Sequence, residues 1–267
     1  MTRISVLGGG RMGEALVAGL LESGIEPEHL CVAEFDAERR RMLEAAFAEV
    51  RVVPSAAWAL PDADVVIIAV KPGDVPGLLA SAVDALGEQT LVVSIAAGVT
   101  IAELEQLVPG RPVVRAMPNT PAVIRCGAAA IAGGTHADDL HLTLAESLLE
   151  AVGTVVRVPE SQLDAVTGLS GSGPAYVFLV AEALIEAGVL AGIARSTATT
   201  LVNQTILGSA QLLAGGPDGP EALRAAVTSP GGTTAAGLRS LEAHGVRAAF
   251  LDAVTAATNR SKELGQH

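Results

Sequence analysis

The sequence predicts an α/β protein, in which a doubly wound sheet is followed by an all-helical C-terminal domain. Up to about residue 158, short β-branched runs alternate with helical stretches, and beyond it the strand pattern disappears. A glycine-rich loop directly follows the first run. At 267 residues the chain exceeds the usual size of one core, so we expect two domains, 1–158 and 159–267.

Short runs of β-branched residues predict the strands of the N-terminal sheet. They lie at 4–7, 30–33, 64–70, 90–95 and 113–115, with weaker candidates at 127–131 and 154–158. The helices expected between them are 14–23, 36–47, 74–86, 101–107 and 140–151. This alternation is typical of right-handed βαβ units, so we expect buried parallel strands with helices on both faces of the sheet.

The C-terminal part is predicted to be helical, with breaks at 168–174, 215–220 and 229–232. Residues 176–194 are apolar almost all round and near the length of a membrane span, but Glu182 and Glu186 would be costly in lipid. A domain of roughly a hundred residues cannot cover such a helix alone. We therefore expect a homodimer and no membrane.

Charge and cysteine content narrow the class of protein further. Lysine and arginine number 17 against 29 acidic residues, and the net charge of −12 repels nucleic acid. Cys31 and Cys126 have neither metal-ligand spacing nor the density of a secreted disulfide scaffold. The apolar run at the N-terminus is too short for a signal peptide. We expect a cytoplasmic protein without a metal site.

The first strand runs into a G-x-G-x-x-G loop that opens a helix, which is the context a dinucleotide-binding loop requires. Glycines permit a tight turn and close approach of the backbone to a pyrophosphate, whose charge the helix N-terminus attracts. A Rossmann-type domain binding NADPH or NADH is predicted. The loop residues expected to contact the cofactor are Gly8, Gly9, Gly10, Arg11, Met12 and Gly13.

Glu34 ends the second predicted strand about twenty residues beyond the loop, where a carboxylate would bond the adenosine ribose 2′-OH and favour NAD. Against this, Arg11 lies in the loop, and Arg39, Arg40 and Arg41 lie on the next helix, within possible reach of a 2′-phosphate. These arginines are equally well explained as a solvated helix face. The choice between NADPH and NADH therefore stays open.

Other predicted strands also end in candidate cofactor contacts, because open α/β sheets bind ligands beyond the carboxyl ends of their strands. Asn119 and Thr120, flanked by prolines, are expected in an extended turn that borders the nicotinamide. The remaining candidates are Ala69, Val70, Lys71, Pro72, Ala96 and Ala97.

In the helical part, the Ser-Pro-Gly-Gly-Thr-Thr segment at 229–234 precedes a helix through residue 243. Its glycines permit a nest of free N–H groups for an anion at the helix N-terminus. The plainer interpretation is a turn with an N-cap. The segment at 170–173 is read first as a cap of the long helix, and it also fits the lining of a site.

These motifs together resemble the pyrroline-5-carboxylate reductase family. The resemblance rests on residues 8–13, 69–72, 93–98 and 115–121, and on two segments of the second domain, 170–176 and 228–234. It implies a helical domain that interlocks with its twin, often in rings of dimers. The implied reaction passes hydride from NAD(P)H to the C=N carbon of 1-pyrroline-5-carboxylate, giving L-proline in the last step of proline biosynthesis.

The resemblance also implies roles for individual residues. Thr234 matches a threonine that hydrogen-bonds the ring nitrogen, and is the candidate catalytic residue. Two positions depart from the family pattern, since Arg11 replaces a small polar residue and Glu34-Phe35 replaces a pair such as Asn-Arg. The expected substrate-binding residues are Ser229, Gly231, Gly232, Thr233, Thr234 and Asn119.

Two alternatives remain at this point. A 3-hydroxyacid or prephenate dehydrogenase needs a histidine or lysine to take a hydroxyl proton, and Lys262 is the only lysine of the second domain. A non-catalytic dinucleotide sensor would retain the fold without the reaction. The sequence does not show whether the protein forms a dimer or a ring of dimers, or whether it is subject to feedback inhibition. It also leaves open whether Thr234 or water supplies the proton.

Overall fold

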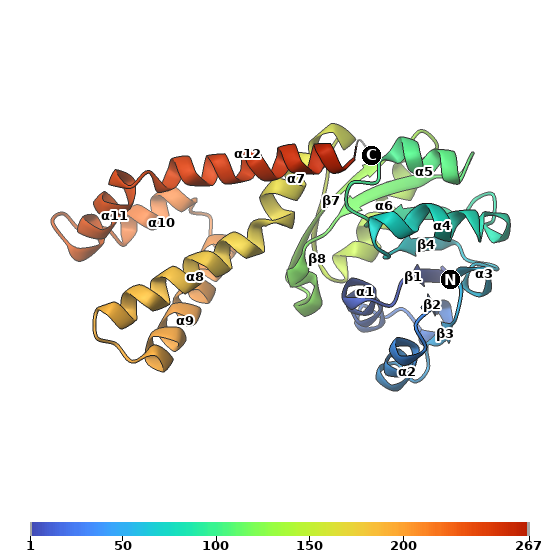
Figure 1. Ribbon diagram of the computed structural model, residues 1–267, viewed down its shortest axis with the longest axis horizontal. Coiled ribbons are helices and arrows are strands. Elements are labelled where there is room, and N and C mark those ends of the chain that lie inside the picture. Colours follow the sequence, from blue (N-terminus) through green and yellow to red (C-terminus); the bar gives the residue numbers. More distant parts are fainter. Residues whose placement is uncertain (1, 266–267) are drawn as a thin grey trace. The chain divides into compact units, whose positions relative to one another are not determined.

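The computed structural model describes residues 2–265, which group into two compact units (Figure 1). Of the described residues, unit 1 comprises 2–172 with 255–265, and unit 2 comprises Gly173–Val254. The domain division predicted at residue 158 stays a prediction. The contacts group residues up to Ser172 with the sheet because segments beyond residue 158 pack on it, as the fully buried Leu163 does against Ala130 and Ala132.

Unit 1 is built on one eight-stranded sheet with the order β3-β2-β1-β4-β5-β6-β7-β8. Strands β1 to β6 are parallel to one another. The strands are β1 (Ile4–Leu7), β2 (Leu30–Ala33), β3 (Arg51–Val53), β4 (Val65–Ile68), β5 (Leu91–Ser94), β6 (Val113–Met117), β7 (Gly127–Gly133) and β8 (Gly153–Arg157).

The sheet differs from the sequence prediction in two strands. β3 was not predicted, because it is three residues long and lies at the sheet edge. β7 runs antiparallel to β6, where a parallel strand was expected. The connection from Met117 to Gly127 is too short for the crossover that parallel strands need, so the chain turns back through the 3₁₀ turn Thr120–Ile124 (η4).

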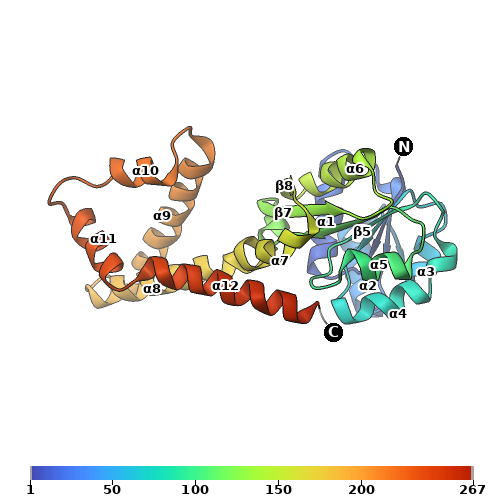
Figure 2. The ribbon, with the colours of Figure 1, turned by 90° about the horizontal axis from the view of Figure 1, so that it is seen from above.

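Helices cover both faces of the sheet, and alternate residues of β4 show how. Val65 and Ile67 pack on the face covered by α1 (Arg11–Glu22), α2 (Ala37–Ala46) and α6 (Asp139–Glu150). Val66 and Ile68 pack on the face covered by α3 (Ala56–Ala59), α4 (Val75–Ala80) and α5 (Ile101–Leu107). In Figure 2, α6 and α4 accordingly lie on opposite sides of the strands. The predicted doubly wound α/β class is confirmed.

One predicted helix is shorter than expected. The pattern at 74–86 predicted continuous helix, but α4 ends at Ala80 and a 3₁₀ turn follows at Val83–Ala85 (η3). Ser81 explains the end, because its N–H and its hydroxyl donate to the carbonyls of Gly77 and Leu78.

All regular secondary structure described in unit 2 is helical. It contains α8 (Gly173–Leu190), α9 (Arg195–Gly215), α10 (Pro220–Ala226), α11 (Thr233–Ala243) and the first part of α12 (Val246–Leu264). α8 and α9 lie side by side (Figure 1), joined by a turn in which Gly192 has a φ of +92°. α8 follows a short helix, α7 (Leu163–Val166), and a π-helical turn, Thr167–Gly171 (η6).

No residue of α8 is buried in the single chain, although the helix is strongly apolar. Phe178, Leu179 and Leu184 are all exposed. Among the described residues, the helical stretch Glu160–Leu190 is long and apolar enough to cross a membrane by length and composition alone, and the mean hydropathy of its most apolar 18-residue window is 1.5. A helix covered by another protein chain passes the same test.

Candidate functional site

The predicted cofactor residues of unit 1 share one edge of the sheet. Leu7 at the end of β1 pairs with both Ala33 and Ile68, the last residues of β2 and β4, and Ile68 pairs with Ser94. The N–H of Gly8 then donates to Ala33 at 2.9 Å. Parallel pairing in register therefore brings the loops after four strands together, as the sequence predicted.

The glycine loop has the close packing that its motif predicts. Gly8 has a φ of +112°, and a Cβ there would lie 2.7 Å from the carbonyl oxygen of Ala69. A Cβ on Gly13 would lie 2.0 Å from the carbonyl oxygen of Gly8, so α1 packs directly on the strand end. A Cβ on Gly10, by contrast, would meet nothing within 4 Å. Of the three glycines in the G-x-G-x-x-G spacing, Gly8 and Gly13 are thus required by the fold, and Gly10 borders open space.

The N-terminus of α1 is free to bind an anion. The helix begins at Arg11, and its N-cap residue, Gly10, has no side chain to bond the first-turn N–H groups. The positive end of the helix dipole points the same way, and Arg11 is exposed, whereas Met12 packs partly against the core. The loop and helix start therefore fit the pyrophosphate of a dinucleotide.

Two charged residues near the loop, Glu34 and Arg39, are hydrogen-bonded to its backbone. The carboxylate of Glu34 is buried and accepts the N–H of Gly9 at 2.9 Å. Arg39 donates to the carbonyl of Gly9, and Arg40 donates to the carbonyls of Glu34 and Phe35. The interpretation as a solvated helix face fits Arg41, which is exposed and whose side chain bonds to the carbonyl of Ala37 in its own helix.

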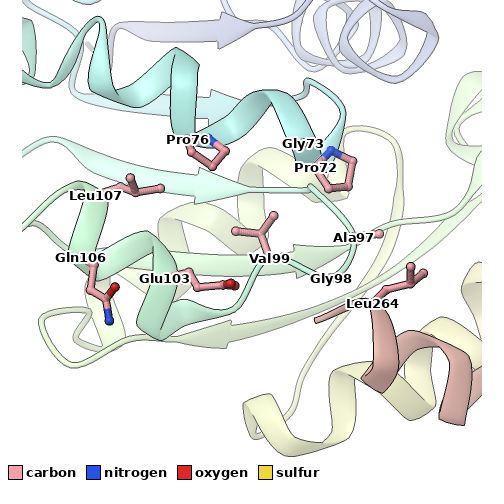
Figure 3. Close-up of a pocket in the computed structure, with 10 residues that line it drawn as sticks. All are labelled: Pro72, Gly73, Pro76, Ala97, Gly98, Val99, Glu103, Gln106, Leu107 and Leu264. Atoms are coloured by element: carbon pink, nitrogen blue, oxygen red, sulfur yellow. The ribbon is translucent and has the colours of Figure 1, made fainter. Parts of the chain in front are cut away.

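A pocket of about 480 Å³ lies beyond the ends of β4 and β5 (Figure 3). Pro72 and Ala97 line it, together with Glu103 of α5 and Leu264 near the end of α12. Val70 reaches Gly8, while Lys71 is exposed and Ala96 is buried. Two of the six predicted contacts from these strand ends thus line one pocket, whose other lining residues are mostly apolar.

Asn119 has a structural task that sequence reasoning missed. Its Nδ2 donates to the carbonyl of Ser170 at 3.0 Å, and its Oδ1 accepts the N–H of Ala128 at 2.9 Å. The side chain therefore ties the end of β6 to η6 and to β7. The flanking prolines signalled an ordered turn, but nothing in the sequence identified these two partners.

An ion pair between buried Arg115 and partly exposed Glu160 in unit 1 was also not predicted. Arg115 of β6 is 6% exposed, and its Nη1 lies 3.0 Å from Oε1 of Glu160. The same oxygen accepts the N–H of Ile101, the first residue of α5, at 2.7 Å. The sequence signal was a charge inside a buried strand, which requires a partner of opposite charge.

In unit 2, the segment before α11 forms the predicted turn. Gly231 has a φ of +68°, and the N–H of Gly232 donates to Ser229 at 3.0 Å. A Cβ on Gly232 would lie 2.3 Å from the hydroxyl oxygen of Ser229. α11 begins at Thr233 without a side-chain cap, so its first N–H groups are free to bind an anion.

Thr234 is half-buried, and its hydroxyl has no hydrogen-bond partner among residues 2–265. In contrast, Thr199 and Thr205 of α9 each donate to the carbonyl four residues earlier. Thr234 lies in the first turn of its helix, where no helical carbonyl stands four residues back. Its hydroxyl is therefore available to a ligand, as its predicted role requires.

Within the described part of the chain, no group of three or more histidine, cysteine or acidic side chains could hold a metal ion. The candidate residues therefore form two groups, one at the strand edge of unit 1 and one at the N-terminus of α11 in unit 2.

Comparison with curated proteins identifies the family. A pyrroline-5-carboxylate reductase of Mycobacterium tuberculosis is 45% identical, over 99% of this chain and 97% of its own length. The chain belongs to the pyrroline-5-carboxylate reductase family. The family resemblance predicted from the motifs is thereby confirmed.

Family models and solved structures agree with this placement. Residues 160–264 match the model described as pyrroline-5-carboxylate reductase dimerisation, and residues 3–98 match one described as NADP oxidoreductase, coenzyme F420-dependent. The structure of a pyrroline-5-carboxylate reductase from Coxiella burnetii has a TM-score of 0.94 and 38% identity, covering 98% of both chains. The Plasmodium falciparum reductase with NADP bound has a TM-score of 0.86 and 30% identity, covering 99% of this chain and 98% of its own.

Membership of the pyrroline-5-carboxylate reductase family settles several predictions. The chain is an NAD(P)-dependent oxidoreductase, and its dimerisation domain makes it a homo-oligomer that acts on a small molecule. The assignment of individual site residues, by contrast, stays a prediction.

Proposed function

We propose that this chain reduces 1-pyrroline-5-carboxylate to L-proline with a hydride from NADPH or NADH. The observation that carries the proposal is the 45% identity with a reductase of this name over 99% of the chain, which includes both parts of the site. The cradle at residues 8–13 fits the pyrophosphate because it leaves open space at Gly10 and a free helix N-terminus.

The substrate carboxylate would bind at the N-terminus of α11. The protein carries a net charge of −12, so a negatively charged substrate needs a local source of positive potential. Backbone N–H groups supply it here, because Gly232 leaves the first turn of α11 uncapped. We assign this anion site to Ser229, Gly231, Gly232, Thr233 and Thr234.

Thr234 would orient the ring nitrogen of the substrate. The cofactor, when bound, supplies hydride to the carbon of the C=N bond, and the nitrogen then carries the proton it already held or gains one. Transfer needs an aligned imine more than a strong acid, so the hydroxyl of Thr234 acts mainly by holding the ring in place. Asn119 would support the site from unit 1 through its bonds to Ser170 and Ala128.

Higher assembly and compartment belong to the same proposal. The exposed apolar side chains of α8 and α9 would be covered by a second copy of the chain rather than by lipid, because Glu182 and Glu186 lie within α8. A ring of such dimers, located in the cytoplasm, fits the net negative charge and the two free cysteines.

The test is the decay of cofactor absorbance when the purified protein meets 1-pyrroline-5-carboxylate near neutral pH. NADPH and NADH are assayed separately, and proline is quantified as product. We expect consumption of reduced cofactor to match the proline formed. The ratio of kcat/KM for the two cofactors then gives the preference that the sequence left open.

Two outcomes would contradict the proposal. Faster turnover on 3-hydroxy acids than on the pyrroline would favour the dehydrogenase alternative. No turnover with either cofactor, in folded protein that still binds dinucleotide, would favour the sensor.

A further inference from the structure

Glu34 is held by two backbone groups, one on each carboxylate oxygen. Its Oε2 accepts the N–H of Gly9 and its Oε1 accepts the N–H of Asp36, both at 2.9 Å. The residue is 8% exposed. An acidic residue that selects the adenosine ribose needs a carboxylate oxygen directed at the 2′-OH. Both oxygens of Glu34 are already bonded to the protein.

Arg39 holds the other side of the same peptide. Its Nε donates to the carbonyl oxygen of Gly9 at 2.6 Å, and its Nη2 lies 2.5 Å from Oε2 of Glu14 on α1. The backbone N–H of Arg39 donates to Asp36, the N-cap residue of α2. The guanidinium is therefore bonded to both the loop and α1 and is not extended toward solvent.

Gly9 is consequently hydrogen-bonded to two groups of opposite charge, because its N–H donates to the Glu34 carboxylate and its carbonyl accepts from the Arg39 guanidinium. A Cβ at this position would lie 2.4 Å from Cδ1 of Leu43, so a side chain there would require Leu43 to move. Three consecutive glycines give a loop high conformational entropy, which binding would otherwise have to remove. Charge-assisted hydrogen bonds are strong enough to hold such a loop in one conformation.

We propose that Glu34 and Arg39 are positioning residues that clamp the Gly9 peptide and so pre-form the phosphate-binding loop for either cofactor. The inference rests on the proposed cofactor site and deepens it. Glu34 then acts through the loop on the pyrophosphate, which NADH and NADPH share, and does not select between them. Selection falls to groups beyond the clamp, such as the exposed Arg11.

The test measures the Kd of NADH and of NADPH by calorimetry without substrate, in the full-length protein. Glu34→Gln keeps the size of the side chain but replaces one carboxylate oxygen with an NH₂ group. Only one oxygen then remains for the N–H groups of Gly9 and Asp36, which each bond to a separate oxygen of Glu34. We expect both Kd values to rise by the same factor, about tenfold or more, with their ratio unchanged. Arg39→Met, which keeps the length of the stem, should give the same pattern.

Matched controls lie on the same helix. Glu38→Gln and Arg41→Met make the same charge changes at exposed positions of α2 that do not contact the loop. Both should leave the two Kd values within about twofold of the unaltered protein. A general charge effect would move the controls as well.

A second readout needs no cofactor. Amide hydrogen exchange at residues 8–10 of the free protein should accelerate in Glu34→Gln and Arg39→Met, and not in the controls. Unchanged exchange in both variants would overturn the clamp. So would a Glu34→Gln protein that binds NADH more weakly and NADPH more tightly, because that is the behaviour of a ribose selector. Faster exchange in a protein that binds neither cofactor would support the clamp and refute the proposed function.

Discussion

Thr234 is the residue on which the proposed chemistry depends most directly. Its hydroxyl lies in the first turn of α11 and bonds to no other residue that the structure describes, unlike those of Thr199 and Thr205 in α9. A helical threonine whose hydroxyl is left free, next to an uncapped helix N-terminus, has the chemistry to hold a ring nitrogen beside a carboxylate.

Thr234→Ala should lower kcat by about ten- to a hundredfold while the Kd of either cofactor stays unchanged, because the hydroxyl contacts only the substrate. Steady-state kinetics and calorimetry measure the two effects separately. Thr234→Ser is the matched control and should keep most of the activity. Loss of cofactor binding in the alanine variant would refute the role assigned to Thr234.

Asp138 gives a pH-dependent prediction at the same scale. The backbone N–H of His141 donates to this carboxylate, and that bond chiefly lowers the pKa of Asp138 below its usual value. A lowered pKa means that the native state prefers the charged form. The stability it contributes is therefore present above the usual pKa, near 4, and is lost as the pH falls through the lowered value.

Asp138→Asn should accordingly flatten the dependence of stability on pH below about 4. Urea unfolding midpoints at pH 7 and at steps below pH 4 measure this. At pH 7 an asparagine still caps α6, so the difference there should be small. An equal slope in both proteins would show that the cap bond does not stabilise the ionised form.

At the scale of the elements, the glycines in the turn from β1 into α1 have different roles, since Gly13 is needed for packing and Gly10 borders open space. Gly13→Ala places a Cβ 2.0 Å from the carbonyl oxygen of Gly8, so we expect a loss of about 2–3 kcal/mol in the free energy of unfolding. Gly10→Ala meets nothing within 4 Å and should leave that free energy nearly unchanged. Chemical denaturation of the free protein compares the two. Similar losses in both variants would contradict the packing described here.

Gly10→Ala should still weaken cofactor binding, because the new methyl group lies in the open space where the backbone approaches the pyrophosphate. Calorimetric titration with NADH and NADPH should show a similar rise in both Kd values. A variant that binds both cofactors as tightly as the unaltered protein would place the phosphates elsewhere.

The sequence pattern predicted those helices and strands whose structure depends on their own residues rather than on neighbouring segments. The buried runs that became β1, β2 and β4 are apolar on both faces and were recognisable as strands. β3 is too short for a pattern, and the direction of β7 depends on the length of the preceding connection rather than on its own residues. Elements were thus predictable where local burial determines them.

The candidate site was predicted less completely, because its contacts join residues far apart in the sequence. Glycine spacing predicted the phosphate loop, and the Thr-Thr segment predicted the start of α11. The bonds from Glu34 to Gly9 and from Asn119 to Ser170 span 25 and 51 positions and follow no repeat. Only the folded structure shows that both side chains are already bonded to backbone.

At the scale of the whole molecule, the exposed apolar surface of α8 is the proposed contact between two copies of the chain. Leu179→Glu introduces a charge at a residue that is 65% exposed in the single chain and that a second copy would bury. We expect the association to weaken by about thirtyfold or more. Light scattering after size-exclusion chromatography measures the mass over a dilution series.

Leu140→Glu is the control for this prediction. Leu140 is 77% exposed on α6 of unit 1, away from the predicted dimerisation segment. Its replacement should leave the mass unchanged. A Leu179→Glu protein of unaltered mass would show that α8 is not covered by a second copy.

The uncovered helices of unit 2 also bear on how the stability of this protein is to be expressed. If part of the apolar core is completed only by another copy, the melting temperature follows mass action and rises with protein concentration. For a dimer, each tenfold dilution removes about 1.4 kcal/mol from the apparent free energy of unfolding. Cells that make little of this protein would then hold it nearer to its unfolding threshold than a concentrated sample suggests.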